Sequence, residues 1–281
     1  MKYRILGSLA LFAASCYATP VEVWVDDANG NIGEVNVATG GVTMVGSAGV
    51  QLTDMAFTAN GALYGISYNS FYGINTSTGQ ATLIGALGDS TTANSLTFGP
   101  NGTLYTADLV NLYTIDLSTG FANYVGPMGY SSGGGLAFVN GTLYLATLSN
   151  QLATVNPTTG TATVVGNLGA LNIYGLAAVG STLYGFGGAN GEDVYSINLS
   201  TGAATYISTW AGSGLGVAYG AAYDPLSLDN NPIPDPPTVP EPATFALFGI
   251  GCLLLGLGFR LRSMTAGAPI GETGEAQPAQ R

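Results

Sequence analysis

The stretch GLAFVNGTLYLATLSNQLATVNPTTGTATVV, residues 135–165, contains one complete unit of the pattern that builds this chain. Four short apolar-rich segments, at 135–139, 142–148, 151–155 and 161–165, are separated by turn residues. Asn-Gly between such segments is a strong hairpin signal, and an Asx residue followed by Gly closes backbone turns. The stretch therefore predicts four consecutive antiparallel strands.

The turn sequence Asn-Pro-Thr-Thr-Gly in this unit has four relatives elsewhere in the chain. The five copies are Asn36–Gly40, Asn75–Gly79, Asp116–Gly120, Asn156–Gly160 and Asn198–Gly202. Their glycines are 39, 41, 40 and 42 residues apart. A repeated metal or sugar ligand is one interpretation, but we favour a turn because Gly accepts the left-handed backbone conformation. Four strands per period of about 40 residues are typical of a β-propeller blade.

The two ends of the repeated region predict how the ring closes. The first repeat begins with a strand at 21–25 that aligns with the second strand of later units, so its innermost strand is missing. A spare strand at 215–219 follows the fifth unit and aligns with that innermost position. Pairing the two would remove an open sheet edge. We predict an all-β, five-bladed propeller over residues 19–224, similar in architecture to WD40-like and YVTN-like propellers.

A Leu-Tyr pair recurs at one place in four of the units. The pairs are Leu63-Tyr64, Leu104-Tyr105, Leu143-Tyr144 and Leu183-Tyr184. An aromatic stripe can bind sugars by stacking, but strictly repeated apolar positions are more often packing positions. We therefore expect these tyrosines to lie between blades.

The predicted propeller contains no basic residue. The chain has five Lys and Arg residues and no His, and the five are Lys2, Arg4, Arg260, Arg262 and Arg281. A surface without cations repels phosphate backbones, so we expect no nucleic-acid partner. Catalytic dyads or triads built on His, and zinc sites built from His or Cys, are excluded for this region.

Carboxylates are the remaining candidates for catalysis. Glycan hydrolysis needs two acids about 5 to 10 Å apart. The innermost strands offer Asp54 alone, and the loop acids are Asp89, Asp108 and Asp193. We therefore expect a protein that is not an enzyme, and a glycan-active hydrolase or lyase is the alternative.

One loop of the first repeat has the composition of a calcium-binding loop. Its oxygen-bearing side chains are Asp26, Asp27, Asn29, Asn31 and Glu34. The fifth repeat has a similar segment, Asn-Gly-Glu-Asp at 190–193, which we expect to be a neighbour where the ring closes. Because the full EF-hand spacing is absent, a solvated turn is the alternative. No other cofactor is expected.

The N-terminus has the order of a secretory signal peptide. Lys2 and Arg4 precede an apolar stretch at 5–14, and Ala18 is a small residue suited to cleavage after it, so residues 1–18 are expected to be removed. A lipoprotein signal at Cys16 is a weaker alternative, since no Leu or Val stands three residues earlier. The other cysteine, Cys252, lies in an apolar run, so the exported domain has no disulfide.

The C-terminal region combines a spacer, a triplet, an apolar run and a basic cluster. A Pro-rich spacer at 225–239 leads to Pro240-Glu241-Pro242. An uncharged run at 243–259 would span roughly 26 Å as a helix, the lower limit for a bilayer. Arg260 and Arg262 favour a cytoplasmic end, which leaves the preceding residues on the outer side. We expect one transmembrane helix here.

Together the triplet, apolar run and arginines at 240–262 resemble the PEP-CTERM sorting signal of Gram-negative bacteria. The resemblance implies that Pro240, Glu241 and Pro242 form the motif recognised by an exosortase-like membrane enzyme. It also implies export, transient membrane anchoring, and a final place at the cell surface or outside the cell with exopolysaccharide. The polar tail at 263–281 extends beyond the family's usual end, and a plain membrane anchor that is never cut is the alternative. We expect an exported binding module whose ligand is neutral polysaccharide or an envelope protein.

Overall fold

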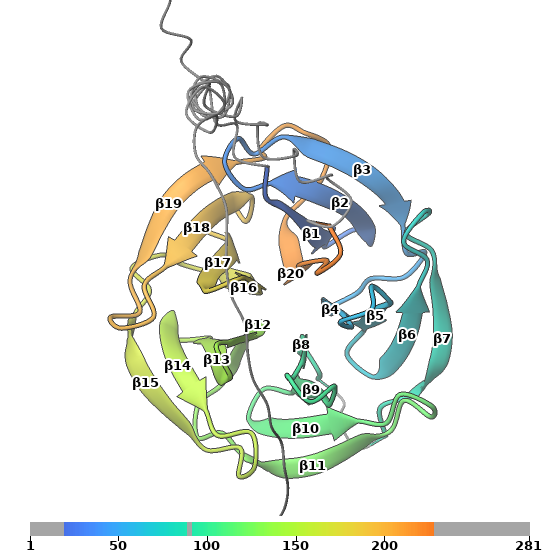
Figure 1. The fold of residues 1–281 in the computed structure, drawn as a ribbon, viewed down its shortest axis with the longest axis vertical. Helices are drawn as coiled ribbons and strands as arrows, with labels where there is room; N and C mark the ends of the chain where they lie inside the picture. The colour runs from blue at the N-terminus through green and yellow to red at the C-terminus, as the bar shows by residue number, and fades with distance from the viewer. Residues whose placement is uncertain (1–19, 89–91, 228–281) are drawn as a thin grey trace, which may run out of the picture. The chain divides into compact units, whose positions relative to one another are not determined.

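The fold is a ring of five four-stranded antiparallel sheets around a central axis (Figure 1). A computed structural model describes residues 20–88 and 92–227, and twenty strands lie in these two ranges. The predicted all-β, five-bladed propeller is therefore confirmed. The expected signal peptide, sorting signal and transmembrane helix lie outside these residues. Within 20–88 and 92–227, no helix is long and apolar enough to span a membrane.

Four blades are each built from one continuous stretch of chain, with strands running outward from the axis. Blade 2 contains β4 (Asp54–Phe57), β5 (Leu63–Ile66), β6 (Ser70–Ile74) and β7 (Ala81–Ala86); blade 3 contains β8 (Ser95–Phe98), β9 (Leu104–Ala107), β10 (Asn111–Ile115) and β11 (Ala122–Pro127); blade 4 contains β12 (Ser132–Val139), β13 (Thr142–Thr147), β14 (Gln151–Val155) and β15 (Ala162–Asn167); blade 5 contains β16 (Ile173–Val179), β17 (Thr182–Gly187), β18 (Asp193–Ile197) and β19 (Ala204–Thr209). The four strands predicted for the unit at 135–165 are thus present.

Blade 1 combines both ends of the propeller, as predicted. Its order is β20 (Ala218–Ala222), β1 (Glu22–Asp27), β2 (Asn31–Asn36) and β3 (Val42–Ser47), with Trp24 opposite Ala222. The closing strand begins three residues later than the predicted 215–219. The reason is that Gly216 belongs to the preceding loop, where its carbonyl oxygen accepts a bond from the Trp210 indole N–H at 3.1 Å.

The repeated Asx-to-Gly signature forms the predicted turn in every blade. In blade 3, Asp116 Oδ1 accepts the N–H groups of Ser118 and Thr119 at 2.9 and 3.1 Å, and Gly120 has φ of +79°. The turn of each blade also contacts the outer strand of the preceding blade. A Cβ on Gly85 of β7 would lie 1.9 Å from the Thr119 carbonyl oxygen, so this outer-strand glycine lets the turn of blade 3 rest directly on blade 2.

Aromatic side chains fill the junctions between blades at the end of the channel where the first and second strands of each blade are joined. The rings of Tyr64 and Phe98 have centroids 6.0 Å apart, and those of Tyr105 and Phe138 are 5.6 Å apart. Each pair joins the second strand of one blade to the innermost strand of the next. The predicted role of the Leu-Tyr tyrosines in packing is confirmed for Tyr64 and Tyr105.

Candidate binding site in the central channel

The channel is lined by the innermost strands β20, β4, β8, β12 and β16 (Figure 1). Each strand contributes one residue at the same register position, and each of these residues is at most 3% exposed. These five residues, named the channel seal, are Met55, Leu96, Leu136, Leu176 and Ala221. Two cavities lie at opposite ends of the innermost strands, one on each side of the seal.

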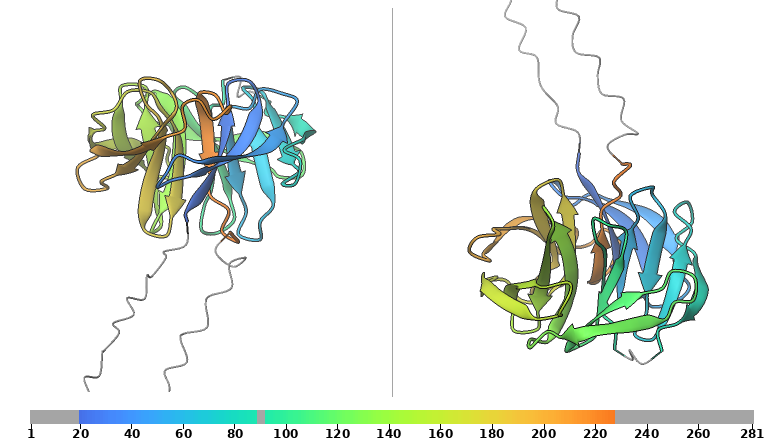
Figure 2. Two further views of the ribbon diagram at one scale, coloured as in Figure 1. Left: turned by 90° about the horizontal axis from the view of Figure 1, so that it is seen from above. Right: turned by 60° about the horizontal axis from the view of Figure 1, so that its bottom comes forward.

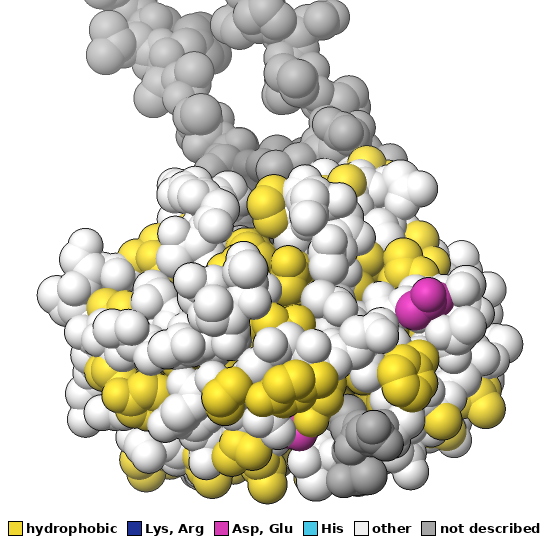
Figure 3. Space-filling model, turned by 90° about the horizontal axis from the view of Figure 1, so that it is seen from below, with side chains coloured by type: hydrophobic (Ala, Val, Ile, Leu, Met, Phe, Trp, Pro, Cys, Tyr) yellow, Lys and Arg dark blue, Asp and Glu magenta, His cyan; other side chains and the backbone are white. Residues whose placement is uncertain are grey.

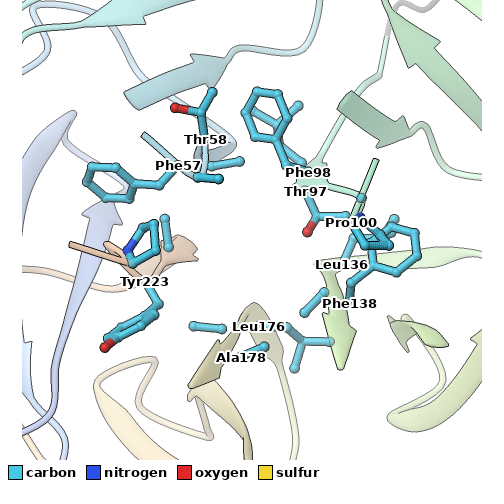
Figure 4. Close-up of a pocket in the computed structure, with 18 of the residues that line it drawn as sticks. Phe57, Thr58, Thr97, Phe98, Pro100, Leu136, Phe138, Leu176, Ala178 and Tyr223 are labelled. Atoms are coloured by element: carbon cyan, nitrogen blue, oxygen red, sulfur yellow. The ribbon is translucent and has the colours of Figure 1, made fainter. Parts of the chain in front are cut away.

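The larger cavity, about 480 Å³, is an apolar funnel at the C-terminal ends of the innermost strands. Its wall carries Phe57, Phe98, Phe138, Tyr223 and Ala178 at five equivalent positions, and Figure 4 shows their side chains around the opening. Most of these rings are engaged in blade junctions. Phe57, for example, packs edge-on against Trp24 with centroids 5.3 Å apart. The funnel wall therefore holds the blades together.

Both ends of the described chain lie on the funnel face. β1 begins beside the end of β20, since Trp24 is opposite Ala222. Tyr223 and Pro225, which follow β20, line the funnel, and Figure 2 shows the two coloured ends on one side of the ring. The chain thus enters and leaves the propeller beside the funnel, and the opposite face is free of both ends.

The smaller cavity, about 310 Å³, opens on that opposite face, and we name it the tyrosine mouth. Three tyrosines from different blades line it, namely Tyr68, Tyr174 and Tyr219. The polar groups of its lining include Thr53, Asn94 and Ser132, and Leu109 and Leu148 complete the rim. Tyr174 and Tyr219 occupy the same position of their innermost strands, two residues before Leu176 and Ala221, whereas Tyr68 comes from a loop. Sequence reasoning missed them because only two of the five blades carry a tyrosine at this position. The matching Tyr-Gly pairs at 174–175 and 219–220 were the available signal.

Asp54, which begins β4 beside the seal, is fully engaged by backbone donors. Its Oδ1 accepts the N–H of Met55 at 2.8 Å and of Ala221 at 3.2 Å, and its Oδ2 accepts the N–H of Leu96 at 2.6 Å. The carboxyl group therefore joins the innermost strands of blades 1, 2 and 3. Burial, followed by the nearby Asp26, raises its pKa, while the three N–H donors oppose that shift.

Asp26 is the neighbour that sequence reasoning did not place beside Asp54. It is 0% exposed, and neither carboxyl oxygen has a hydrogen-bond partner among the described groups. Gly220 is opposite Asp26 in the sheet, and a Cβ at Gly220 would lie 2.6 Å from Asp26 Oδ1 and 2.3 Å from Asp54 Oδ1. Burial, followed by Asp27, raises the pKa of Asp26 to about 8. Because burial raises the pKa of both carboxyl groups, the folded pair retains protons that the unfolded chain releases at neutral pH.

The five predicted calcium ligands do not converge in the structure. Asp26 is part of the buried pair, and Glu34 is opposite Trp24 in the sheet. Asp27 Oδ1 accepts the N–H groups of Asn29 and Asn31, both at 2.8 Å. Among the described residues, no three acids form a cluster suited to a metal. This geometry favours the alternative, a hydrogen-bonded turn, and calcium binding stays a prediction.

The loops of the first and fifth repeats do meet where the ring closes. Asp27 Oδ2 accepts the N–H of Gly216 at 2.9 Å, and Ala28 donates to Val217 O at 3.0 Å. On the other side, Ala218 donates to Gly191 O at 2.9 Å. The segment before β20 is therefore held between the two loops. Polar groups in these loops form the hydrogen bonds that close the ring.

The remaining candidate catalytic acids are either engaged or outside the described residues. Asp108 accepts the Tyr113 hydroxyl at 2.8 Å, and Asp193 accepts the Tyr195 hydroxyl at 3.2 Å. Asp89 lies outside the described residues. Neither the funnel nor the tyrosine mouth has an acid among its described lining residues. The channel therefore offers aromatic, aliphatic, hydroxyl and amide groups for binding.

Comparison with known families identifies the tail. Residues 238–263 match the family described as the PEP-CTERM protein-sorting motif. The chain carries a PEP-CTERM sorting motif. The predicted signal at 240–262 falls inside this match, with Pro240, Glu241, Pro242, Arg260 and Arg262. The PEP-CTERM motif indicates export, transient membrane anchoring and exosortase processing.

Solved structures support the fold of the propeller that precedes this motif. A chain of a nidogen/laminin complex is 14% identical with a TM-score of 0.51, over 73% of this chain and 98% of the other. A protein of unknown function from Bacteroides thetaiotaomicron is also 14% identical with a TM-score of 0.51, over 74% of this chain and 66% of the other. Such low identities show the fold alone. No curated protein matches the chain in sequence.

Proposed function

We propose that this protein is an exported, non-catalytic binding module that binds neutral exopolysaccharide at the cell surface or in the extracellular matrix. The observation that carries the proposal is the lining of the channel, where described groups are aromatic, aliphatic, hydroxyl or amide and none is an acid. Neutral sugars bind through aromatic faces and hydroxyl or amide hydrogen bonds. The sorting motif supports a site of action outside the inner membrane.

The surface supports the same ligand class. The side of the propeller in Figure 3 carries hydrophobic and uncharged side chains with few acids and no Lys or Arg. Recognition of a charged ligand through Arg forks is unavailable to residues 20–88 and 92–227 because they contain no Arg. An envelope protein is the other partner that such a neutral face could bind, and it becomes an outcome of the test below.

Burial of the Asp26–Asp54 pair supports a non-catalytic role. The two carboxyl groups are 0% and 1% exposed, so a glycan cannot reach them. The pair also lies beside the channel seal and outside both cavity linings. A hydrolase or lyase would need its acids at an open cavity.

The test incubates the purified full-length exported protein with exopolysaccharide from the organism that produces it. We expect the protein to co-sediment with the polymer while the number of reducing ends and unsaturated sugars stays constant. Release of either would overturn the non-catalytic assignment. Failure to co-sediment, together with cross-linking to an envelope protein, would replace polysaccharide with a protein ligand.

Processing of the tail has its own measurement. Because exosortase processing acts at the sorting motif, protein recovered from the culture supernatant should end near Pro242. Mass spectrometry of the C-terminal peptide locates that end. Recovery of Arg281 in the membrane fraction alone would instead identify an uncut anchor.

A further inference from the structure

We propose that the tyrosine mouth is the subsite that binds a neutral sugar unit of the polysaccharide, a proposal that rests on the function proposed above. Its three tyrosines come from the loop after β5, the start of β16 and the strand β20. Three blades thus contribute one aromatic side chain each to a single cavity.

The tyrosines of the mouth are free for a ligand. Tyr68 is 49% exposed, and Tyr174 and Tyr219 are partly exposed. None of the three forms a ring pair or a hydroxyl hydrogen bond with another described side chain. The funnel aromatics differ, since Phe57, Phe98 and Phe138 are each paired across a blade junction. Partly exposed rings with unused hydroxyl groups are suited to stacking on a sugar and bonding its hydroxyls.

Asn94, which lines the same cavity, has a side-chain oxygen without a hydrogen-bond donor among the described groups. Its amide nitrogen donates to Ser132 O at 3.2 Å, while its Oδ1 is buried without a partner among the described groups. A buried acceptor without a donor is unfavourable. A hydroxyl group of a bound sugar would supply the missing donor, which gives Asn94 a specific role in binding.

Backbone geometry keeps space open beside the rings. Blade 4 contributes Gly133 and Gly134 to the mouth, and the pairing of β12 with β13 is irregular there. A Cβ on Gly134, whose φ is +125°, would lie 2.8 Å from the Tyr174 carbonyl oxygen. A side chain at this position is therefore excluded, and the cavity next to Tyr174 stays available to a ligand.

The chemistry of the cavity restricts the ligand to a neutral one. No charged residue is among its described lining residues, and its volume of about 310 Å³ is at the lower end for small-ligand sites. We therefore expect a short stretch of uncharged sugar, bound with an affinity that changes little between low and high salt.

The experiment measures binding of neutral oligosaccharides, prepared by partial hydrolysis of the exopolysaccharide, to the full-length exported protein by calorimetry. Tyr174→Ala and Tyr219→Ala should each weaken binding about tenfold, because each removes a stacking surface. Tyr174→Phe and Tyr219→Phe keep the ring and remove only the hydroxyl, so about threefold is expected. The Phe variants keep the test decisive if an Ala variant unfolds.

The matched control is Tyr206→Ala. Tyr206 is 55% exposed on β19, at the outer edge of blade 5 and outside the mouth, so its removal should change affinity less than about twofold. If the wild type binds and all four mouth variants keep its affinity, the subsite is wrong while the polysaccharide function stands. If the wild type binds neither oligosaccharide nor polymer, the proposed function itself fails.

Discussion

The two ends of the central channel are built from aromatic residues in different ways. In the funnel, three phenylalanines at equivalent positions each pair across a blade junction, as Phe57 does with Trp24. In the tyrosine mouth, Tyr174 and Tyr219 also share one position of the innermost strands, but neither they nor Tyr68 has a ring partner among the described residues. Rings that are paired across a blade junction therefore hold the propeller together, and the unpaired rings of the mouth are available for a ligand.

The strongest test of this comparison removes a funnel ring. Phe57→Ala should lower the free energy of unfolding by about 4 kcal/mol, because Phe57 is 8% exposed and its loss leaves a cavity beside Trp24. Urea denaturation followed by tryptophan fluorescence measures the change. Leu83→Ala, at a side chain that is 62% exposed, is the control and should change stability by less than about 0.5 kcal/mol.

Binding by the Phe57→Ala variant then separates the two ends of the channel. The folded fraction should bind oligosaccharide as tightly as the wild type. A variant of normal stability that no longer binds would instead make the funnel the binding end.

The next effect concerns the buried pair beside the seal. The pKa of Asp26 is about 8 in the folded protein, above the ordinary value of 3.8, so the folded state retains a proton that the unfolded chain releases. The stability that Asp26 contributes is therefore fully present below about pH 4 and is lost as the pH rises toward 8. Between pH 5 and 8 this contribution to the free energy of unfolding of the wild type should fall by about 3 kcal/mol.

Asp26→Asn is the matched variant for this pH effect, since it keeps the shape and cannot titrate. Its unfolding free energy should fall less than that of the wild type over the same pH range, and the remaining slope includes Asp54, whose pKa burial also raises. Urea denaturation at each pH measures both slopes. Equal slopes for variant and wild type would mean that other groups control the pH dependence.

A smaller loss is expected from Asp54→Asn. The amide keeps one acceptor oxygen but points N–H donors at a place where Asp54 Oδ2 accepts the Leu96 N–H. The unfolding free energy should fall by about 2 kcal/mol because one buried backbone donor loses its acceptor. Thermal or urea denaturation checks this, and an unchanged stability would show that Asp54 does not join the three blades.

The smallest effect is expected from calcium. The turn between β1 and β2 lies on the face of the tyrosine mouth, but Asp27 already accepts the N–H groups of Asn29, Asn31 and Gly216. Adding calcium or a chelator should therefore move the melting temperature by less than about 1 °C. A clear rise with calcium would restore the predicted metal site and place a charge on the binding face.

The repeat allowed the architecture to be predicted, and the reason is local chemistry. Each Asx-to-Gly signature determines its own turn, so five copies specify five outer hairpins, and counting strands predicts the mixed blade. The boundary of β20 could not be predicted because Gly216 is committed to the Trp210 loop by a long-range contact. Turn type also escaped prediction. The sequence has five Asn-Gly pairs, and the asparagine has a positive φ in one of them, Asn140, at +49°.

The buried pair was visible in the sequence only through the repeat. At the register position of Asp26, the other four blades carry apolar residues, namely Ile66, Ala107, Ala146 and Phe186. An acid in an otherwise apolar column indicates a buried carboxyl group, whereas its loop-like neighbourhood suggested a calcium ligand. The tyrosine mouth depends on three blades meeting at one end of the channel, which no single stretch of sequence specifies.

Backbone hydrogen exchange of the full-length exported protein, with and without exopolysaccharide, shows which end of the channel binds the polymer. Binding at the tyrosine mouth should slow exchange in the segments around Tyr68, Tyr174 and Tyr219. The funnel segments at 57–61, 98–102 and 138–141 should exchange at unchanged rates. Slowed exchange confined to the funnel segments, or no change anywhere on saturation with polymer, would contradict the account.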